Sequence, residues 1–165
     1  MERTLDPARL GDHLDRLYRA AWALCGSRED AEDLVQETYA RLLARPRLLR
    51  NEDDLGYLLR ALRNTFLNQK RTESRRPRPG PLPEQLDLIA DPQAREPQAA
   101  LEASELYAAI AALPGEFRDI LVAVDVTGLS YKEAAHALRI PEGTVMSRLY
   151  RARQQVVRRV DGESE

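Results

Sequence analysis

Arginine side chains gather near the end of the chain, in the stretch IPEGTVMSRLYRAR of residues 140–153. The spacing of Val145 and Leu149 predicts a helix that begins after Pro141 and buries one face. The side chains left for other contacts are Met146, Ser147, Arg148, Tyr150, Arg151 and Arg153. An arginine can bond phosphate oxygens, which gives affinity, or pair with a guanine edge, which gives sequence reading. The stretch therefore indicates a helix suited to binding DNA.

A basic helix can equally be an ordinary solvated surface, so the arginines alone leave both interpretations open. The residues before the stretch favour DNA binding. Ser130 and Glu133 have the spacing of a capping box, which predicts a short helix from residue 130 to about residue 138. A turn at residues 139–141 then joins this helix to the arginine-rich one. The arrangement has the proportions of a helix-turn-helix, a DNA-binding motif.

Acidic side chains gather in a second segment, REDAEDLVQE of residues 28–37. Helical spacing places Leu34 and Val35 on a buried face and leaves the acidic side chains on the opposite face. The candidates for contact there are Asp30, Asp33, Gln36 and Glu37. Such a face is either solvated or docks on a basic partner, and the residues themselves leave both interpretations open. A metal site is not supported, because no second cluster with suitable spacing accompanies the acidic one.

A third charged segment, residues 60–78, is basic. Its only acid is Glu73, opposed by Arg60, Arg63, Lys70, Arg71, Arg75, Arg76 and Arg78. Residues 139–159 are also basic, with Glu142 as their only acid. The formal net charge of -2 therefore conceals two basic segments suited to nucleic acid and one acidic segment suited to a protein partner.

Catalytic residues are not apparent. His13 and His136 lie in different halves of the chain, and Cys25 is the only cysteine. No glycine-rich loop follows a predicted strand, so neither a nucleophile with its base nor a phosphate cradle can be assembled. We therefore expect no enzymatic activity, no cofactor and no metal.

The elements that must position these residues are helices, because 32% of the residues are charged and only 5% are aromatic. We expect an all-α fold of two small helical domains. The proline-rich residues 77–97 predict a flexible linker between an N-terminal domain of residues 1–76 and a C-terminal domain of residues 98–165. Helices are predicted at about 14–25, 28–45, 52–76, 101–113, 117–126, 130–138 and 142–160.

The compartment predicted from the sequence is the cytoplasm. A single cysteine excludes a disulfide within the chain, and the start MERTLDPARL has charges where a signal peptide needs an apolar run. No apolar run approaches the roughly 20 residues needed to span a bilayer.

Five motifs, in order along nearly the whole chain, resemble bacterial sigma factors of the extracytoplasmic-function (ECF) group. They are REDAEDLVQET at 28–38, LLRALRN at 58–64, LPGEFR at 113–118, GLSYKEAA at 128–135 and IPEGTV at 140–145. The resemblance implies a dissociable initiation subunit of RNA polymerase. The N-terminal half would dock on the polymerase and open the minus-ten promoter element, and the C-terminal half would read the minus-thirty-five element.

The resemblance also implies partners. Asp33, Gln36 and Glu37, with Asp30 beside them, would contact the clamp helices of the largest polymerase subunit, and the C-terminal half would contact the flap region of the second largest. No small-molecule substrate is implied, because the polymerase itself makes the phosphodiester bonds. An anti-sigma factor, often membrane-bound in this group, would be the regulatory partner. The linker would thread the polymerase cleft.

By the same resemblance, Asn64 and Asn68 would lie near a flipped-out base of the minus-ten element, with Arg41 nearby and residues 47–54 forming one wall of the pocket. The backbone of the melted strand would be held by Lys70, Arg71, Arg75 and Arg76. Tyr57 replaces a tryptophan that is frequent in the family, which implies a smaller stacking surface.

The minus-thirty-five element would be read by Thr144, Met146, Ser147, Arg148, Tyr150, Arg151 and Arg153. Of these, Ser147 and Arg151 are the main expected contacts. Met146 stands where many members carry lysine or arginine, so an apolar contact replaces a possible phosphate or guanine contact.

A different class of protein also fits part of the pattern, namely a stand-alone helix-turn-helix regulator whose N-terminal half mediates protein interaction. The Asn64 segment with its basic extension discriminates the two, because such a regulator does not need it. An enzyme that hydrolyses its substrate with a metal on the acidic helix is a weaker alternative, since a second ligand helix is missing.

Overall fold

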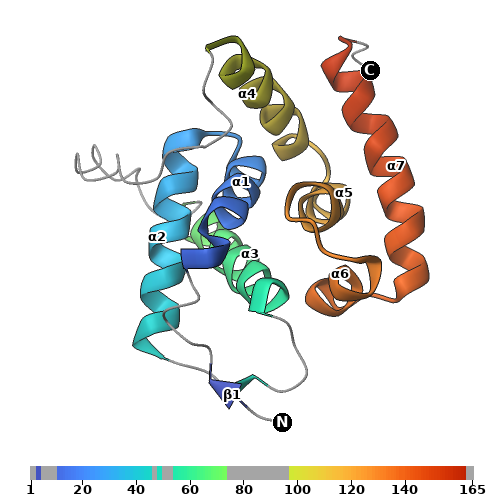
Figure 1. Cartoon of the computed structure of the whole chain (residues 1–165). Coiled ribbons are helices and arrows are strands. Elements are labelled where there is room, and N and C mark those ends of the chain that lie inside the picture. Colours follow the sequence, from blue (N-terminus) through green and yellow to red (C-terminus); the bar gives the residue numbers. More distant parts are fainter. Residues whose placement is uncertain (1–2, 5–10, 46–47, 50–53, 74–96, 163–165) are drawn as a thin grey trace.

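The structure, a computed structural model, describes residues 3–4, 11–45, 48–49, 54–73 and 97–162. Its elements are β1 (Arg3–Thr4), α1 (Leu14–Cys25), α2 (Arg28–Ala44), β2 (Leu48–Leu49), α3 (Asp54–Glu73), α4 (Pro97–Ala111), α5 (Gly115–Leu121), the π-helical turn η3 (Val122–Val126), α6 (Tyr131–Leu138) and α7 (Glu142–Val160). The predicted all-α class is confirmed (Figure 1). Residues 77–96 of the predicted linker and the basic residues Arg75 and Arg76 lie outside the described residues.

The first three helices form where local signals predict them. α1 ends at Gly26, whose φ of +76° is the left-handed conformation that glycine adopts without strain. The hydroxyl of Ser27 caps α2 by accepting a hydrogen bond from the amide of Asp30 over 3.4 Å. Leu34, Leu58 and Leu62 are completely buried, which places the core of the N-terminal half between α1, α2 and α3.

In α1 almost every side is covered, which the predicted helix at 14–25 did not by itself indicate. Its buried residues are Leu17, Tyr18, Ala20, Ala21, Trp22, Ala23 and Leu24. α2 and α3 pack on one side of α1, while α4 and η3 of the C-terminal half pack on the other (Figure 1). The small side chains of AAWALC suit a helix that is enclosed in this way.

The two halves of the chain pack directly against each other. The rings of Trp22 and Tyr107 meet edge to face with centroids 4.9 Å apart. A Cβ added at Gly26 would lie 3.0 Å from the Cβ of Ala111, so the absence of a side chain there permits the close approach of α1 and α4. The sequence did not predict how the halves are placed relative to each other.

The helix-turn-helix of the C-terminal half has the predicted form. Ser130 and Glu133 make the reciprocal capping box: the Ser130 hydroxyl accepts from the Glu133 amide over 3.0 Å, and the Glu133 carboxylate accepts from the Ser130 amide over 2.8 Å. Arg139 ends α6 with a φ of +58°. α7 then begins after Pro141, whose carbonyl accepts from the Thr144 amide over 3.0 Å.

Three local features differ from the prediction. α4 begins at Pro97, the last residue of the predicted linker, and not at about residue 101. Residues 117–126, predicted as one α-helix, form all but the first two residues of α5 and then η3. In η3 the Thr127 amide donates to the Val122 carbonyl five residues back over 2.8 Å. The Thr127 hydroxyl donates to the same carbonyl over 2.7 Å, so a buried side chain satisfies the wide turn. β1 and β2 pair antiparallel, a two-residue ribbon too short for a period-two pattern to reveal.

Candidate functional site

The arginine-rich helix α7 presents the face that the sequence predicts. Val145, Leu149, Ala152 and Val156 are buried, which confirms the predicted core stripe. Opposite them, Met146 is 59% exposed and Tyr150 is 66% exposed. Ser147 and Arg151 are exposed on the same side, whereas Thr144 is half-buried. The first turns of α7 therefore offer hydroxyl, thioether, phenol and guanidinium groups to a ligand.

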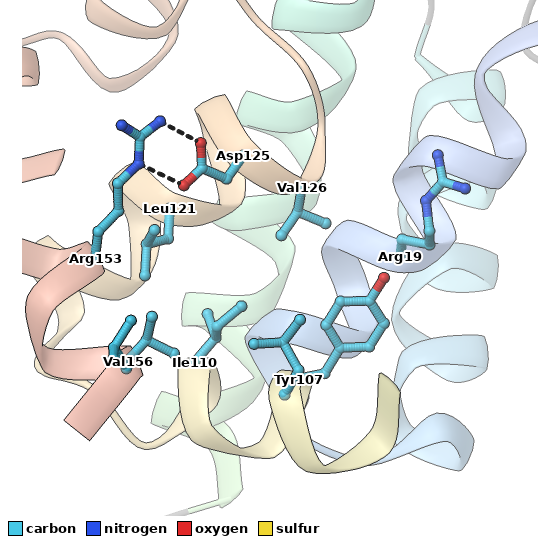
Figure 2. Close-up of a pocket in the computed structure, with 10 residues that line it drawn as sticks. Arg19, Tyr107, Ile110, Leu121, Asp125, Val126, Arg153 and Val156 are labelled. Carbon is cyan, nitrogen blue, oxygen red and sulfur yellow. Dashed lines mark hydrogen bonds and ion pairs between the residues drawn. The ribbon is translucent and has the colours of Figure 1, made fainter. Parts of the chain in front are cut away.

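Arg153 belongs to this helix but is held by another element. Its Nε and Nη2 donate to the two carboxylate oxygens of Asp125 over 3.0 and 2.7 Å (Figure 2). The hydrogen bond with Asp125 raises the pKa of the Arg153 guanidinium. Arg153 therefore ties α7 to η3 in this conformation, and its predicted contact with DNA stays a prediction. At the edge of the same face, Nη2 of Arg148 lies 3.9 Å from the Oε2 carboxylate oxygen of Glu116.

Replacing Arg153 with alanine is expected to lower the melting temperature by about 2 °C, because the bidentate pair between α7 and η3 is lost. Arg151→Ala is the matched control, since it removes an exposed guanidinium from the same helix. Thermal unfolding followed by circular dichroism compares the two variants. Equal melting temperatures would show that the pair with Asp125 contributes nothing to packing.

α3 carries the amide side chains singled out in the sequence. Asn64 and Asn68 are both exposed and lie one turn apart. The Asn68 side-chain oxygen accepts from Nη2 of Arg71 over 3.1 Å, which orients that amide. Lys70 is exposed and lies 5.6 Å from the ring centre of Phe66. The last two turns of α3 thus place two amides and two cations on accessible surface.

The acidic surface of α2 is tied to α3 by its own side chains. Glu37 accepts from Nη2 of Arg41 over 2.9 Å through one oxygen and from the side-chain amide of Gln69 through the other. No sequence signal points to Gln69, since only the packing of α2 on α3 brings it to Glu37. The predicted polymerase-contacting residue Glu37 and the predicted DNA-contacting residue Arg41 are therefore direct neighbours.

Carboxylates crowd the exposed side of α2. Gln36 and Asp30 are exposed, while Asp33 and Glu37 are half-buried. Burial, together with the charges of Asp30 and Glu37, raises the pKa of the Asp33 carboxyl above its ordinary value. The repulsion among these groups would be relieved by a cationic partner laid across this face.

Tyr57, in the first turn of α3, is only 8% exposed and belongs to the hydrophobic core. In this conformation its ring is not accessible to a base pair, and the stacking role implied by the resemblance stays a prediction. Most of the loop at 47–54 that would form the pocket wall lies outside the described residues.

Cys25 lies at the end of α1 as a free thiol. Burial, followed by the charge of Asp30, raises its pKa to about 12. A thiol with this pKa has almost no thiolate at neutral pH and reacts slowly, which favours a packing role. Within the described ranges, no group of three His, Cys, Asp or Glu side chains could hold a metal ion. The described helices include none that is long and apolar enough to span a membrane.

A groove of about 540 Å³ opens between α1, α4, η3 and α7 (Figure 2). Tyr107, Ile110 and Val156 form its apolar floor, and Arg19 and the Arg153–Asp125 pair lie at its edges. Leu106 of α4, which is 41% exposed, and Val157 of α7, which is 55% exposed, also line it. The sequence did not predict this groove, because it is formed by elements from both halves.

Two family models match the chain, one in each half. Residues 10–76 match the model of sigma-70 region 2, and residues 103–156 match that of sigma-70, region 4. The chain is 38% identical to the ECF RNA polymerase sigma factor SigE of Mycolicibacterium smegmatis over 87% of its own length and 57% of that protein. It is 34% identical to EcfG of Rhodopseudomonas palustris, covering 82% of this chain and 74% of EcfG. It is 31% identical to SigL of Mycobacterium tuberculosis, covering 92% of this chain and 86% of SigL.

Solved structures share the fold. The sigma factor RpoE in complex with the anti-sigma factor NepR, from Bartonella quintana, superposes with a TM-score of 0.67 at 24% identity, over 93% of this chain and 95% of that one. CnrH in complex with the cytosolic domain of CnrY gives a TM-score of 0.60 at 23% identity, over 95% of this chain and 86% of that one. At these identities the likeness shows the fold alone.

Proposed function

The chain belongs to the sigma-70 family, in the ECF group of RNA polymerase sigma factors, and from this premise we propose that it binds core RNA polymerase and directs promoter-specific initiation. The N-terminal half, residues 1–76, docks on the polymerase and opens the minus-ten element. The C-terminal half, residues 98–165, reads the minus-thirty-five element. The polymerase supplies the chemistry of phosphodiester bond formation.

The observation that carries this proposal is the presence of two separate DNA-suited faces in one chain. α3 exposes Asn64 and Asn68 next to Lys70, a combination suited to unpaired bases and their phosphates. α7 exposes Ser147 and Arg151 at the start of the second helix of a helix-turn-helix, a position suited to the major groove. A stand-alone regulator needs only the second face, so the first one favours a sigma factor.

The acidic surface of α2 supplies the contact with the polymerase in this proposal. Asp33, Gln36 and Glu37 share one side of the helix, and Asp30 lies beside them. Their clustered charge attracts a basic surface and orients the encounter. The clamp helices of the largest subunit would be that surface. The C-terminal half would meet the flap region of the second largest subunit.

Transcription with reconstituted holoenzyme tests the function. Purified protein added to core polymerase is expected to give promoter-dependent transcripts from a library of genomic fragments, and mapping their 5′ ends supplies the recognised sequence. A second sigma factor of known promoter serves as the control for core activity. Absence of new transcripts, together with tight duplex binding in the absence of core, would instead support the stand-alone regulator.

An anti-sigma factor is the regulatory partner that we propose, since the solved sigma factor RpoE, which shares this fold, is in complex with the anti-sigma factor NepR. The apolar groove between α1, α4, η3 and α7 supports this partner, because its lining residues Tyr107, Ile110 and Val157 can accept the apolar face of a helix. A membrane-bound inhibitor of this kind would place the protein at the cytoplasmic side of the membrane until it is released.

A further inference from the structure

Two arginines of α3 are bonded to the C-terminal half. Nε of Arg63 lies 2.7 Å from a carboxylate oxygen of Asp119 on α5. Arg60, one turn earlier, donates from Nη2 to the carbonyl of His136 over 2.8 Å and from Nε to the carbonyl of Ala137 over 3.2 Å. Both carbonyls lie in the last turn of α6, where the helix dipole is negative. α3 is therefore held by cation-to-oxygen contacts at two points.

Asp119 is built into this junction. Its side chain is only 8% exposed, and its second oxygen accepts from Arg118 over 3.1 Å. The Arg118 guanidinium in turn lies 4.9 Å from the ring centre of Phe66 on α3. A carboxylate this well buried needs cationic partners, and one of the two it has belongs to the other half of the chain.

The oxygens that hold these arginines resemble those of nucleic acid in charge and hydrogen bonding. A carboxylate and the carbonyl end of a helix both offer negative oxygens to a guanidinium, as a phosphate does. Arg60 lies four residues before Asn64, which places the two side chains next to each other on the surface of α3. Arg63 immediately precedes Asn64 in the sequence. The arginines nearest to the predicted base-reading amide are thus occupied by the protein itself.

The closed arrangement is incompatible with binding to both promoter elements. Elements named minus-ten and minus-thirty-five lie about 25 base pairs apart, which is roughly 85 Å of duplex at about 3.4 Å per base pair. α3 and α6 are in direct contact in this structure. The two halves must therefore separate before both elements can be engaged, and every bond between α3 and the C-terminal half opposes that separation.

We propose that Arg60 and Arg63 act as a latch, which closes the free protein through Asp119 and the end of α6 and which opens when promoter phosphates take over the two arginines. The closed state is inferred only from the contacts described above, including the ion pair between Arg63 and Asp119. The handover to DNA rests on the proposed sigma function. The device makes the free protein a poor DNA binder and couples release of α3 to release of the helix-turn-helix.

Single-molecule energy transfer on the full chain measures the latch without DNA or polymerase. Donor and acceptor dyes are attached through Ala40→Cys on α2 and Gln154→Cys on α7, both exposed positions, in a Cys25→Ala background. Arg63→Asp places a second carboxylate against Asp119, and the fraction of open molecules is expected to rise by about tenfold or more. Arg45→Asp, which changes the charge equally at an exposed position in the same half, is expected to leave this fraction unchanged.

The dependence of the open fraction on salt gives a second test, because it is expected to have opposite signs in the unmodified chain and in Arg63→Asp. In the unmodified chain, raising the ionic strength to about 1 M shortens the screening length to about 3 Å and is expected to increase the open fraction. In Arg63→Asp the same salt screens a repulsion and is expected to decrease it. An open fraction that is equal in Arg63→Asp and Arg45→Asp, with the same response to salt, would overturn the latch.

The handover is tested with a variant that keeps both arginines. Asp119→Asn removes the acid but leaves α3 intact, and the free protein is expected to bind a single-stranded minus-ten oligonucleotide about fivefold more tightly than the unmodified chain. Arg63→Ala, which leaves Asp119 with Arg118, shows by energy transfer whether opening occurs even if Asp119→Asn unfolds the C-terminal half. Opening without tighter DNA binding would overturn the handover and leave the closed state standing. If Arg63→Ala and Asp119→Asn both gave unchanged energy transfer while transcription stayed normal, the latch would be overturned and the sigma function would stand.

Discussion

Replacing Asp33 and Glu37 together with lysine is expected to weaken binding to core RNA polymerase by about a hundredfold. Each substitution removes one favourable charge and sets a cation against a basic partner, and like charges brought together at an interface cost several kcal/mol. Both side chains are half-buried on the acidic face of α2, so a docked partner would exclude water from them further. The effect is therefore larger than that of an exposed surface charge.

Affinity is measured by titrating labelled core polymerase with the variant at two salt concentrations. Asp12→Lys combined with Asp15→Lys is the matched control, because it makes the same change in charge at exposed positions near the start of α1. A melting curve of each variant checks the fold, since Glu37 also bonds Arg41 and Gln69. If the two double variants bound core equally well, the acidic face would not be the docking surface.

Local signals in the sequence predicted most of the helices and their ends, with the start of α4 and the π-helical η3 as the exceptions. The capping box of Ser130 and Glu133 was predicted because both partners lie within one turn, and its two hydrogen bonds depend on that spacing alone. The buried stripe of α7 was predicted for the same reason, since Val145 and Leu149 repeat at the helical period. Family resemblance was equally local, resting on short contiguous motifs.

Contacts between distant residues were not predictable in this way. Arg153 was assigned to DNA from its position on α7, yet Asp125 holds it from 28 residues away. Arg63 and Asp119 are 56 residues apart, and no periodicity links them. Trp22 is only 3% exposed because Tyr107 of α4 packs against its ring from the other half, a contact that no local pattern indicates. The sequence pattern therefore describes each helix, while the junction between the halves depends on tertiary packing.

The arginines of the free protein fall into two groups, those bonded to oxygens of the protein and those exposed to solvent. Arg60, Arg63 and Arg153 are committed to protein oxygens that the sequence pattern did not reveal. Arg151 is exposed on α7. Charge counts along the chain overestimate the cationic surface that the closed protein offers to DNA. If the proposed latch operates, DNA binding is expected to be weak in the free protein and stronger in a holoenzyme in which Arg60 and Arg63 are released.

Asn64→Ala is expected to slow open-complex formation by about 10- to 100-fold, with binding to core polymerase unchanged. The amide of Asn64 offers a donor and an acceptor on the exposed face of α3, the pair that an unstacked base edge requires. Loss of a paired contact of this kind costs about 1–3 kcal/mol. The acidic face of α2 is untouched by the change, so docking on the polymerase is expected to be preserved.

Asn68→Ala serves as the control on the same helix, and its effect is expected to be smaller. The Asn68 oxygen already accepts from Arg71, so its amide is less available to a base. Permanganate reactivity of unpaired thymines in the minus-ten element reports melting, and competition with a second sigma factor reports core affinity. Slow melting in Asn64→Ala with normal core binding assigns the amide to base capture, because a defect in folding or docking would lower both. Equal melting rates for Asn64→Ala and the unmodified chain would instead place base capture on other residues of α3, of which the adjoining cations Lys70 and Arg71 are the first to examine.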